Sequence, residues 1–110
     1  MSAQTDRFVH DRLPPAAQWP TLNYDLPELR FPPQLNAVQE LLDRAPDKGW
    51  GDRPMLRSPR ITLTYADARE RVDRICRVLV EDLGMEPGNR VLLRGGNSIG
   101  LALAWLAVVK

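Results

Sequence analysis

Residues 63–110 read LTYADARERVDRICRVLVEDLGMEPGNRVLLRGGNSIGLALAWLAVVK, and this stretch decides the fold. Its first part predicts an amphipathic helix, because apolar residues recur at helical spacing and charged residues occupy the other side. The apolar stripe comprises Ala68, Val72, Ile75, Cys76, Leu79 and Leu83. Thr64 and Asp67 have the spacing of a capping box, and Gly84 suits the left-handed residue that ends a helix.

The charged side of this helix alternates acids with arginines. Three pairs place an acid four residues before an arginine: Asp67/Arg71, Glu70/Arg74 and Asp73/Arg77. A nucleic-acid patch needs uncompensated positive charge, so Arg69, Arg71, Arg74 and Arg77 are interpreted as a solvated helix face.

A turn at Pro87-Gly88 leads into a predicted strand over residues 90–94 and an apolar helix over residues 99–109. Between them, Gly95-Gly96-Asn97-Ser98 has two readings. Gly95 and Gly100 have the spacing of a phosphate-binding loop, but Leu101 and Ala102 stand where Lys and Ser or Thr are required. The structural alternative is favoured: the glycines turn the chain, and Asn97 or Ser98 caps the next helix. That helix is about half the length that spans a bilayer, so it is expected to be buried on every side in a larger domain.

Upstream, residues 36–45 predict a helix capped by Asn36. Its apolar positions are Val38, Leu41, Leu42 and Ala45. A polar loop over residues 47–54 follows. Two short strands, residues 54–57 and 61–64, then predict a hairpin around Ser58-Pro59-Arg60.

The N-terminal third is rich in proline: nine of the ten prolines precede residue 60. Residues 13–34 are therefore expected to be extended, after a short helix at 6–12. The arm carries Trp19, Tyr24, Leu26, Leu29 and Phe31, which indicates that it docks on a body.

Bulk properties exclude several classes of protein. A net charge of +1 over 110 residues gives no long-range field for nucleic acid or an anionic membrane. One cysteine excludes an internal disulfide, and the N-terminus lacks a secretory signal, so the expected location is the cytoplasm.

Single residues of chemical interest are interpreted as structural. Cys76 lies on the apolar stripe and is interpreted as a core thiol, and His10 has no visible partner. Trp19, Trp50 and Trp105 read as packing residues, with Trp50 also able to contact a partner. No catalytic, cofactor-binding or metal-binding residue is assigned.

Four motifs in order resemble the start of the large domain of the adenylate-forming superfamily, which includes acyl-CoA synthetases, adenylation domains and luciferases. Residues 63–68, LTYADA, resemble its first core motif, and residues 84–93 resemble the following glycine-containing segment, with Asn89 in place of the usual Asp. Asn97-Ser98 matches the start of the next helix, and residues 106–110 match the opening of the second core motif. Upstream, LPPAAQWP, DLPELRFPPQLNAVQELLDR and GWGDRPMLR are similar to the N-terminal arm of aryl-CoA ligases of the benzoate and 2-aminobenzoate type.

This resemblance implies an α/β fold: a proline-rich arm over residues 1–34, then an incomplete large domain over residues 35–110 with hairpin, helix, strand and apolar helix. It implies a parent ligase that uses ATP, Mg²⁺ and coenzyme A on an aromatic carboxylate. The family's phosphate loop would lie beyond residue 110, so the chain is expected to be an inactive N-terminal fragment that binds none of these. The alternative is a noncatalytic product that acts as an interaction module.

Overall fold

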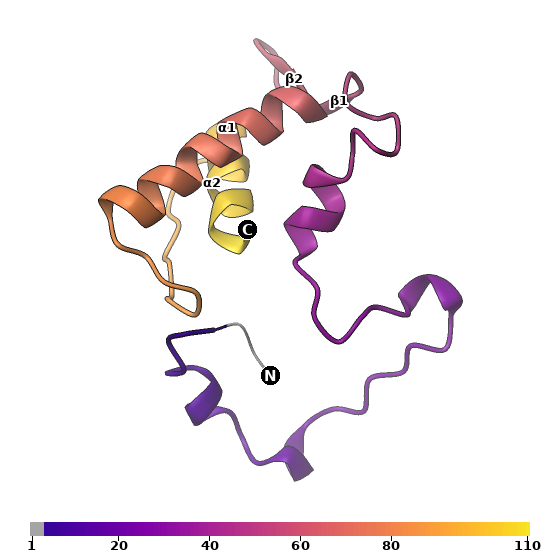
Figure 1. Ribbon diagram of the computed structural model, residues 1–110, viewed down its shortest axis with the longest axis vertical. Helices are drawn as coiled ribbons and strands as arrows, with labels where there is room; N and C mark the ends of the chain where they lie inside the picture. The colour runs from indigo at the N-terminus through magenta and orange to yellow at the C-terminus, as the bar shows by residue number, and fades with distance from the viewer. Residues whose placement is uncertain (1–3) are drawn as a thin grey trace. The chain divides into compact units, whose positions relative to one another are not determined.

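The computed structural model describes residues 4–110 and divides them into two units, each described here by itself. Unit 1 contains residues 4–35 and the turn Glu86–Arg90. Unit 2 contains Asn36–Met85 and Val91–Lys110, and it holds the labelled elements α1, α2, β1 and β2 of Figure 1.

Unit 1 is built from short turns joined by extended segments, as the prolines predict. Its three single-turn 3₁₀ helices are η1 His10–Arg12, η2 Ala16–Gln18 and η3 Pro27–Leu29. The helix predicted over 6–12 is therefore correct only for its last turn. The Asp6 carboxylate accepts the backbone N–H of Phe8 at 2.9 Å, which forms a local turn in place of a helical one. Docking of the arm's apolar side chains stays a prediction.

The predicted hairpin is confirmed. Strand β1 Pro54–Arg57 pairs antiparallel with β2 Thr62–Thr64, and an irregularity in the register falls between Pro54 and Leu56. The Ser58 hydroxyl accepts the backbone N–H of Ile61 at 3.1 Å, so the connection is held by its own side chain. The last residue of β2, Thr64, is also the cap of the following helix.

Helix α1 Tyr65–Arg77 begins at the predicted capping box. The Thr64 hydroxyl accepts the Asp67 N–H at 3.1 Å, and the Asp67 carboxylate accepts the Thr64 N–H at 3.0 Å. The Asp67 carboxylate accepts from both the Thr64 N–H and, at 2.8 Å, the Thr64 hydroxyl, and these two hydrogen bonds lower the pKa of Asp67. A π-helical turn, η5 Val78–Asp82, continues α1, and Gly84 at φ +62° closes it as predicted, with the Met85 N–H bonded to the Leu79 carbonyl at 2.9 Å.

The helix predicted from Asn36 is present and largely π-helical, η4 Gln39–Asp43. The Asn36 side-chain oxygen accepts the N–H groups of Val38 and Gln39, which confirms the cap. Leu42 is 0% exposed, but Leu41 is 56% exposed, so only one of these two apolar positions lies in the core. A π-helical turn is wider than an α-helical turn, so the angular spacing that groups Leu41 with the other apolar positions does not apply to it.

Helix α2 Ile99–Val109 packs against α1 and completes the core of unit 2 (Figure 1). The core cluster takes its buried side chains from η4 and its N-cap, β2, α1 and α2: Val38, Leu42, Leu63, Ala68, Val72, Leu103, Leu106 and Ala107. Only part of the predicted α1 stripe is deeply buried, since Ile75, Cys76 and Leu79 lie partly buried beside the core and Leu83 is exposed. Helix α2 is likewise not covered on every side, because Trp105 is 51% exposed.

The strand predicted over residues 90–94 is wrong for this structure. The segment has no ladder partner among residues 4–110, and Leu92 is 93% exposed. A strand exists only where a neighbour supplies hydrogen bonds, so apolar sequence alone does not make one. The fold is thus a small mixed assembly of helices and one antiparallel hairpin, without the third strand of the expected arrangement.

Candidate functional site

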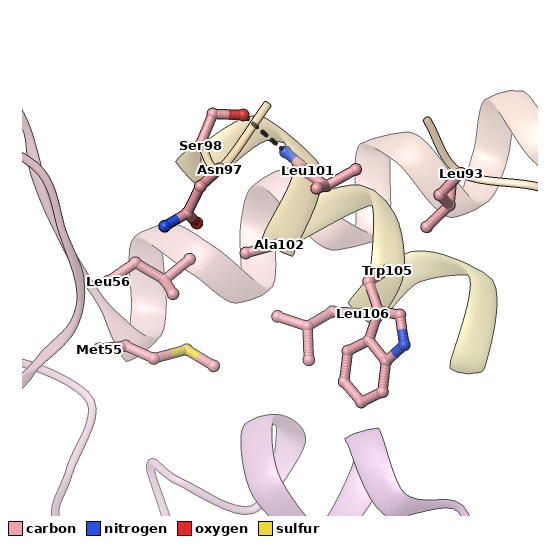
Figure 2. Close-up of a pocket in the computed structure, with 9 residues that line it drawn as sticks. All are labelled: Met55, Leu56, Leu93, Asn97, Ser98, Leu101, Ala102, Trp105 and Leu106. Atoms are coloured by element: carbon pink, nitrogen blue, oxygen red, sulfur yellow. Dashed lines mark hydrogen bonds between the residues drawn. The ribbon is translucent and has the colours of Figure 1, made fainter. Parts of the chain in front are cut away.

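The segment that resembles a phosphate loop starts a helix. The Ser98 hydroxyl accepts the backbone N–H of Leu101 at 3.2 Å, which confirms Ser98 as the cap of α2 (Figure 2). Among residues 4–110, left-handed backbone occurs at Gly49, Gly84 and Gly88. Gly95 and Gly96 therefore lead into α2 with ordinary, negative-φ or extended backbone. The Ser98 oxygen is therefore already engaged by the helix that it caps.

An apolar hollow of about 460 Å³ lies beside this cap, and it is the candidate site of unit 2. Strand β1, the segment after Arg90 and helix α2 supply its walls, and Figure 2 shows Leu106 directed toward the side of the hollow formed by β1. Its lining comprises Met55, Leu56, Leu93, Asn97, Ser98, Leu101, Ala102, Trp105 and Leu106. Asn97 and Ser98 supply the polar side chains of the lining, and no lysine, arginine or histidine belongs to it.

This lining fits an apolar partner and does not fit a phosphate. A transferring phosphate requires cationic groups directed at it, and no lysine, arginine or histidine lines the hollow. Trp105, predicted as a packing residue, lines the hollow with about half of its surface exposed. The sequence signal for the hollow was an all-apolar helix that contains one large aromatic residue.

A second cluster, formed by Asp43, Asp73 and Lys110, joins η4, α1 and the end of α2. The Lys110 ammonium donates to Asp43 Oδ1 and to Asp73 Oδ1, each at 2.6 Å. Burial lowers the pKa of Lys110, but hydrogen bonds and charge from the two carboxylates outweigh it and raise the pKa above the ordinary lysine value. These hydrogen bonds connect the three helices to one another. The sequence analysis missed the cluster because it paired Asp73 with Arg77.

The remaining chemistry-bearing residues have structural environments. Of the three predicted helix pairs, Glu70/Arg74 forms a salt bridge, whereas Asp67 serves the cap and Asp73 bonds Lys110. The arginines of α1 are exposed, which confirms a solvated face. The Cys76 thiol donates to the Ala107 carbonyl at 3.5 Å, and burial raises its pKa, as expected of a core thiol and not of a nucleophile.

The two aromatic residues and the histidine outside the core have local contacts. Trp50 lies 6.1 Å from Tyr65 between ring centroids, which fits packing, whereas Trp19 is half exposed and donates Nε1–H to the Pro14 carbonyl at 2.7 Å. His10 Nδ1 lies 3.1 Å from Arg7 Nη2, so it does have a neighbour. Within residues 4–110, no three His, Cys, Asp or Glu side chains gather into a group able to hold a metal ion. Across the same residues, every helix is too short or too polar to cross a bilayer.

Comparison with known proteins identifies the family. No curated protein and no solved structure matches the chain. Residues 42–110, which include the last two residues of η4, the hairpin, α1, η5 and α2, match the family described as AMP-binding enzyme. The match covers more than half of the chain, including all four motifs at residues 63–110, and so the chain belongs to the AMP-binding, adenylate-forming enzyme family.

Proposed function

We propose that this chain is the N-terminal part of a ligase that joins an aromatic carboxylic acid to coenzyme A at the expense of ATP. The observation that carries the proposal is membership of the AMP-binding enzyme family over residues 42–110. In this proposal residues 1–34 are a proline-rich arm and residues 35–110 begin the large domain. Benzoate and 2-aminobenzoate are the proposed substrates.

The reaction follows from the chemistry of carboxylates. A carboxylate is a poor acyl donor because its oxygen is a poor leaving group. In the proposed first step a carboxylate oxygen attacks the α-phosphorus of ATP, and the bond to pyrophosphate breaks. The thiolate of coenzyme A then attacks the acyl carbon of the adenylate, and AMP leaves with the bonding electron pair.

The residues of this chain would contribute scaffold to that enzyme. The hollow beside α2 has no cationic lining, and the described residues contain no cluster suited to Mg²⁺, so neither ATP nor its metal fits here. In this proposal no step of the reaction is therefore assigned to a side chain of residues 4–110. The apolar hollow and the unpaired segment at 90–94 fit surfaces that the rest of a larger domain covers.

The aromatic substrate class is supported by the arm. Residues 13–20, LPPAAQWP, and residues 25–44, DLPELRFPPQLNAVQELLDR, resemble the arm of benzoate-type ligases. This part of the chain lies mostly outside the family match, so the substrate proposal and the family membership rest on different residues.

We expect the intact protein, meaning the complete gene product, to form aryl thioesters in preference to fatty acyl thioesters. The test incubates it with ATP, Mg²⁺ and coenzyme A and compares benzoate, 2-aminobenzoate, octanoate and acetate by initial rate of thioester formation. A reaction without coenzyme A is the control. Preference for octanoate or acetate would overturn the aromatic assignment, but the proposal that the protein is an acid–thiol ligase would stand. No thioester with any acid would favour a noncatalytic interaction module.

A further inference from the structure

The first turn of the N-terminal arm is bonded to a turn more than 80 residues later in the chain. The backbone N–H groups of Thr5 and Asp6 both donate to the Pro87 carbonyl, at 2.8 and 2.9 Å. The Asp6 carboxylate accepts from the Asn89 amide at 3.0 Å and from the Arg90 guanidinium at 3.4 Å. Backbone and side chain therefore engage the same turn together.

Gly88 provides the place where the two segments meet. Its φ of +102° is a conformation that L side chains rarely adopt. A Cβ at Gly88 would overlap the Asp6 carbonyl oxygen, and it would lie 3.0 Å from the Asp6 carbonyl carbon and 3.2 Å from the Asp6 nitrogen. The neighbours are backbone atoms, so no side-chain rotation relieves the overlap. Glycine at position 88 thus permits the close approach of the arm.

The Phe8 ring lies against arginines of both segments, Arg12 in the arm and Arg90 in the later turn. The Arg90 guanidinium carbon lies 4.0 Å from the centroid of the Phe8 ring, and that of Arg12 lies 3.7 Å from it. Such distances are typical of cation–π contacts. The Phe8 N–H is held by Asp6, and Arg12 Nη1 donates to the Phe8 carbonyl at 3.2 Å.

We propose that residues 5–12 form a strap that closes on the turn Glu86–Arg90, with Gly88 as the position that admits it. The strap gives the proline-rich arm a fixed point of attachment at its beginning. The hydrogen bond from the Phe8 N–H is the main cause of a lowered pKa at Asp6, and the hydrogen bond from Asn89 lowers it further. Asp6 is therefore bonded within the strap as a charged carboxylate. The strap does not depend on the proposed ligase activity, since none of its groups belongs to the candidate site.

The test compares Gly88→Ala with Gly84→Ala in the intact protein. Both glycines have positive φ, so both substitutions strain the backbone, but only position 88 faces Asp6, because nothing lies within 4 Å of a Cβ at Gly84. Hydrogen exchange of the Thr5 and Asp6 amides reports the strap directly. We expect Gly88→Ala to accelerate their exchange by about tenfold or more, and to speed tryptic cleavage after Arg7 and Arg12, while Gly84→Ala changes neither.

A second variant, in the arm itself, tests the strap even if Gly88→Ala fails to fold. Thr5→Pro removes one donor to the Pro87 carbonyl without altering the turn, so it should speed exchange at Asp6 and leave the melting temperature within about 2 °C. Exchange at Thr5 and Asp6 that is unprotected in the unaltered protein would overturn the proposal. Equal acceleration by Gly84→Ala and Gly88→Ala would also overturn it, because backbone strain alone would then explain the effect.

Discussion

Leu42→Ala lowers the free energy of unfolding of the intact protein by about 2–5 kcal/mol, the range for truncating a buried leucine. Leu42 is 0% exposed and belongs to the core that joins η4 to α1 and α2. Truncation loses the transfer free energy of the side chain and leaves a cavity, since the surrounding helices relax only in part. Denaturant unfolding, followed by circular dichroism, measures the change through the midpoint at an unchanged slope.

Leu41→Ala is the matched control, because it removes the same atoms from the neighbouring position. Leu41 is 56% exposed, so its truncation should change the unfolding free energy by no more than about 0.5 kcal/mol. Equal losses at the two positions would contradict the placement of η4, and a larger loss at Leu41 would mean that the helix is rotated relative to the core.

Trp105→Ala is expected to cost about 3–5 kcal/mol in the intact protein, which is the cost of truncating a buried tryptophan. In the 110 residues alone the Trp105 side chain is 51% exposed and lines the apolar hollow with Leu101 and Leu106. An exposed apolar surface of this kind is costly unless other residues cover it. The expected size of the effect therefore follows from the proposal that the rest of the large domain packs on α2.

The control for Trp105 is Arg74→Ala on the charged face of α1. The Arg74 side chain is 74% exposed and pairs with Glu70 on the surface, so its removal should cost at most about 1 kcal/mol. Turnover per folded molecule should survive both changes, because neither residue is placed near ATP. A Trp105→Ala protein as stable as the Arg74→Ala protein would show that the hollow stays open to solvent.

The elements that the sequence predicted correctly are those fixed by local signals. The Thr64–Asp67 capping box, the left-handed Gly84 and the Ser98 cap each depend on residues within six positions of one another. The hairpin likewise depends on a short connection that bonds to itself. Local rules suffice for such features because the hydrogen-bond partners are neighbours in the chain.

The predictions that failed depend on partners or periods that the local sequence does not contain. Residues 90–94 have the composition of a strand, but a strand requires a neighbour, and the described residues provide none. A period of 3.6 residues groups Leu41 with Val38, Leu42 and Ala45, whereas η4 is a π-helical turn in which Leu41 is exposed. Leu83, at the end of the predicted stripe, follows the π-helical turn η5 and is exposed.

The candidate site was beyond sequence analysis for a related reason. The hollow is assembled from β1 and, more than 30 residues later in the chain, from the segment after Arg90 and the helix α2 that directly follows it. Lys110 meets Asp43 and Asp73 across 67 and 37 positions. Spacing rules for helices and strands do not predict contacts between residues so far apart in the sequence. The ordered motifs of residues 63–110, in contrast, did identify the family.

The most direct test of the central claim is acid-dependent exchange of labelled pyrophosphate into ATP by the intact protein, without coenzyme A. Adenylate formation is reversible before the thiol reacts, so we predict label in ATP when benzoate or 2-aminobenzoate is present and none when the acid is omitted. AMP and pyrophosphate should then be the nucleotide products once coenzyme A is added. Absence of acid-dependent exchange in the folded, intact protein, or formation of ADP and orthophosphate instead, would contradict an adenylate-forming ligase.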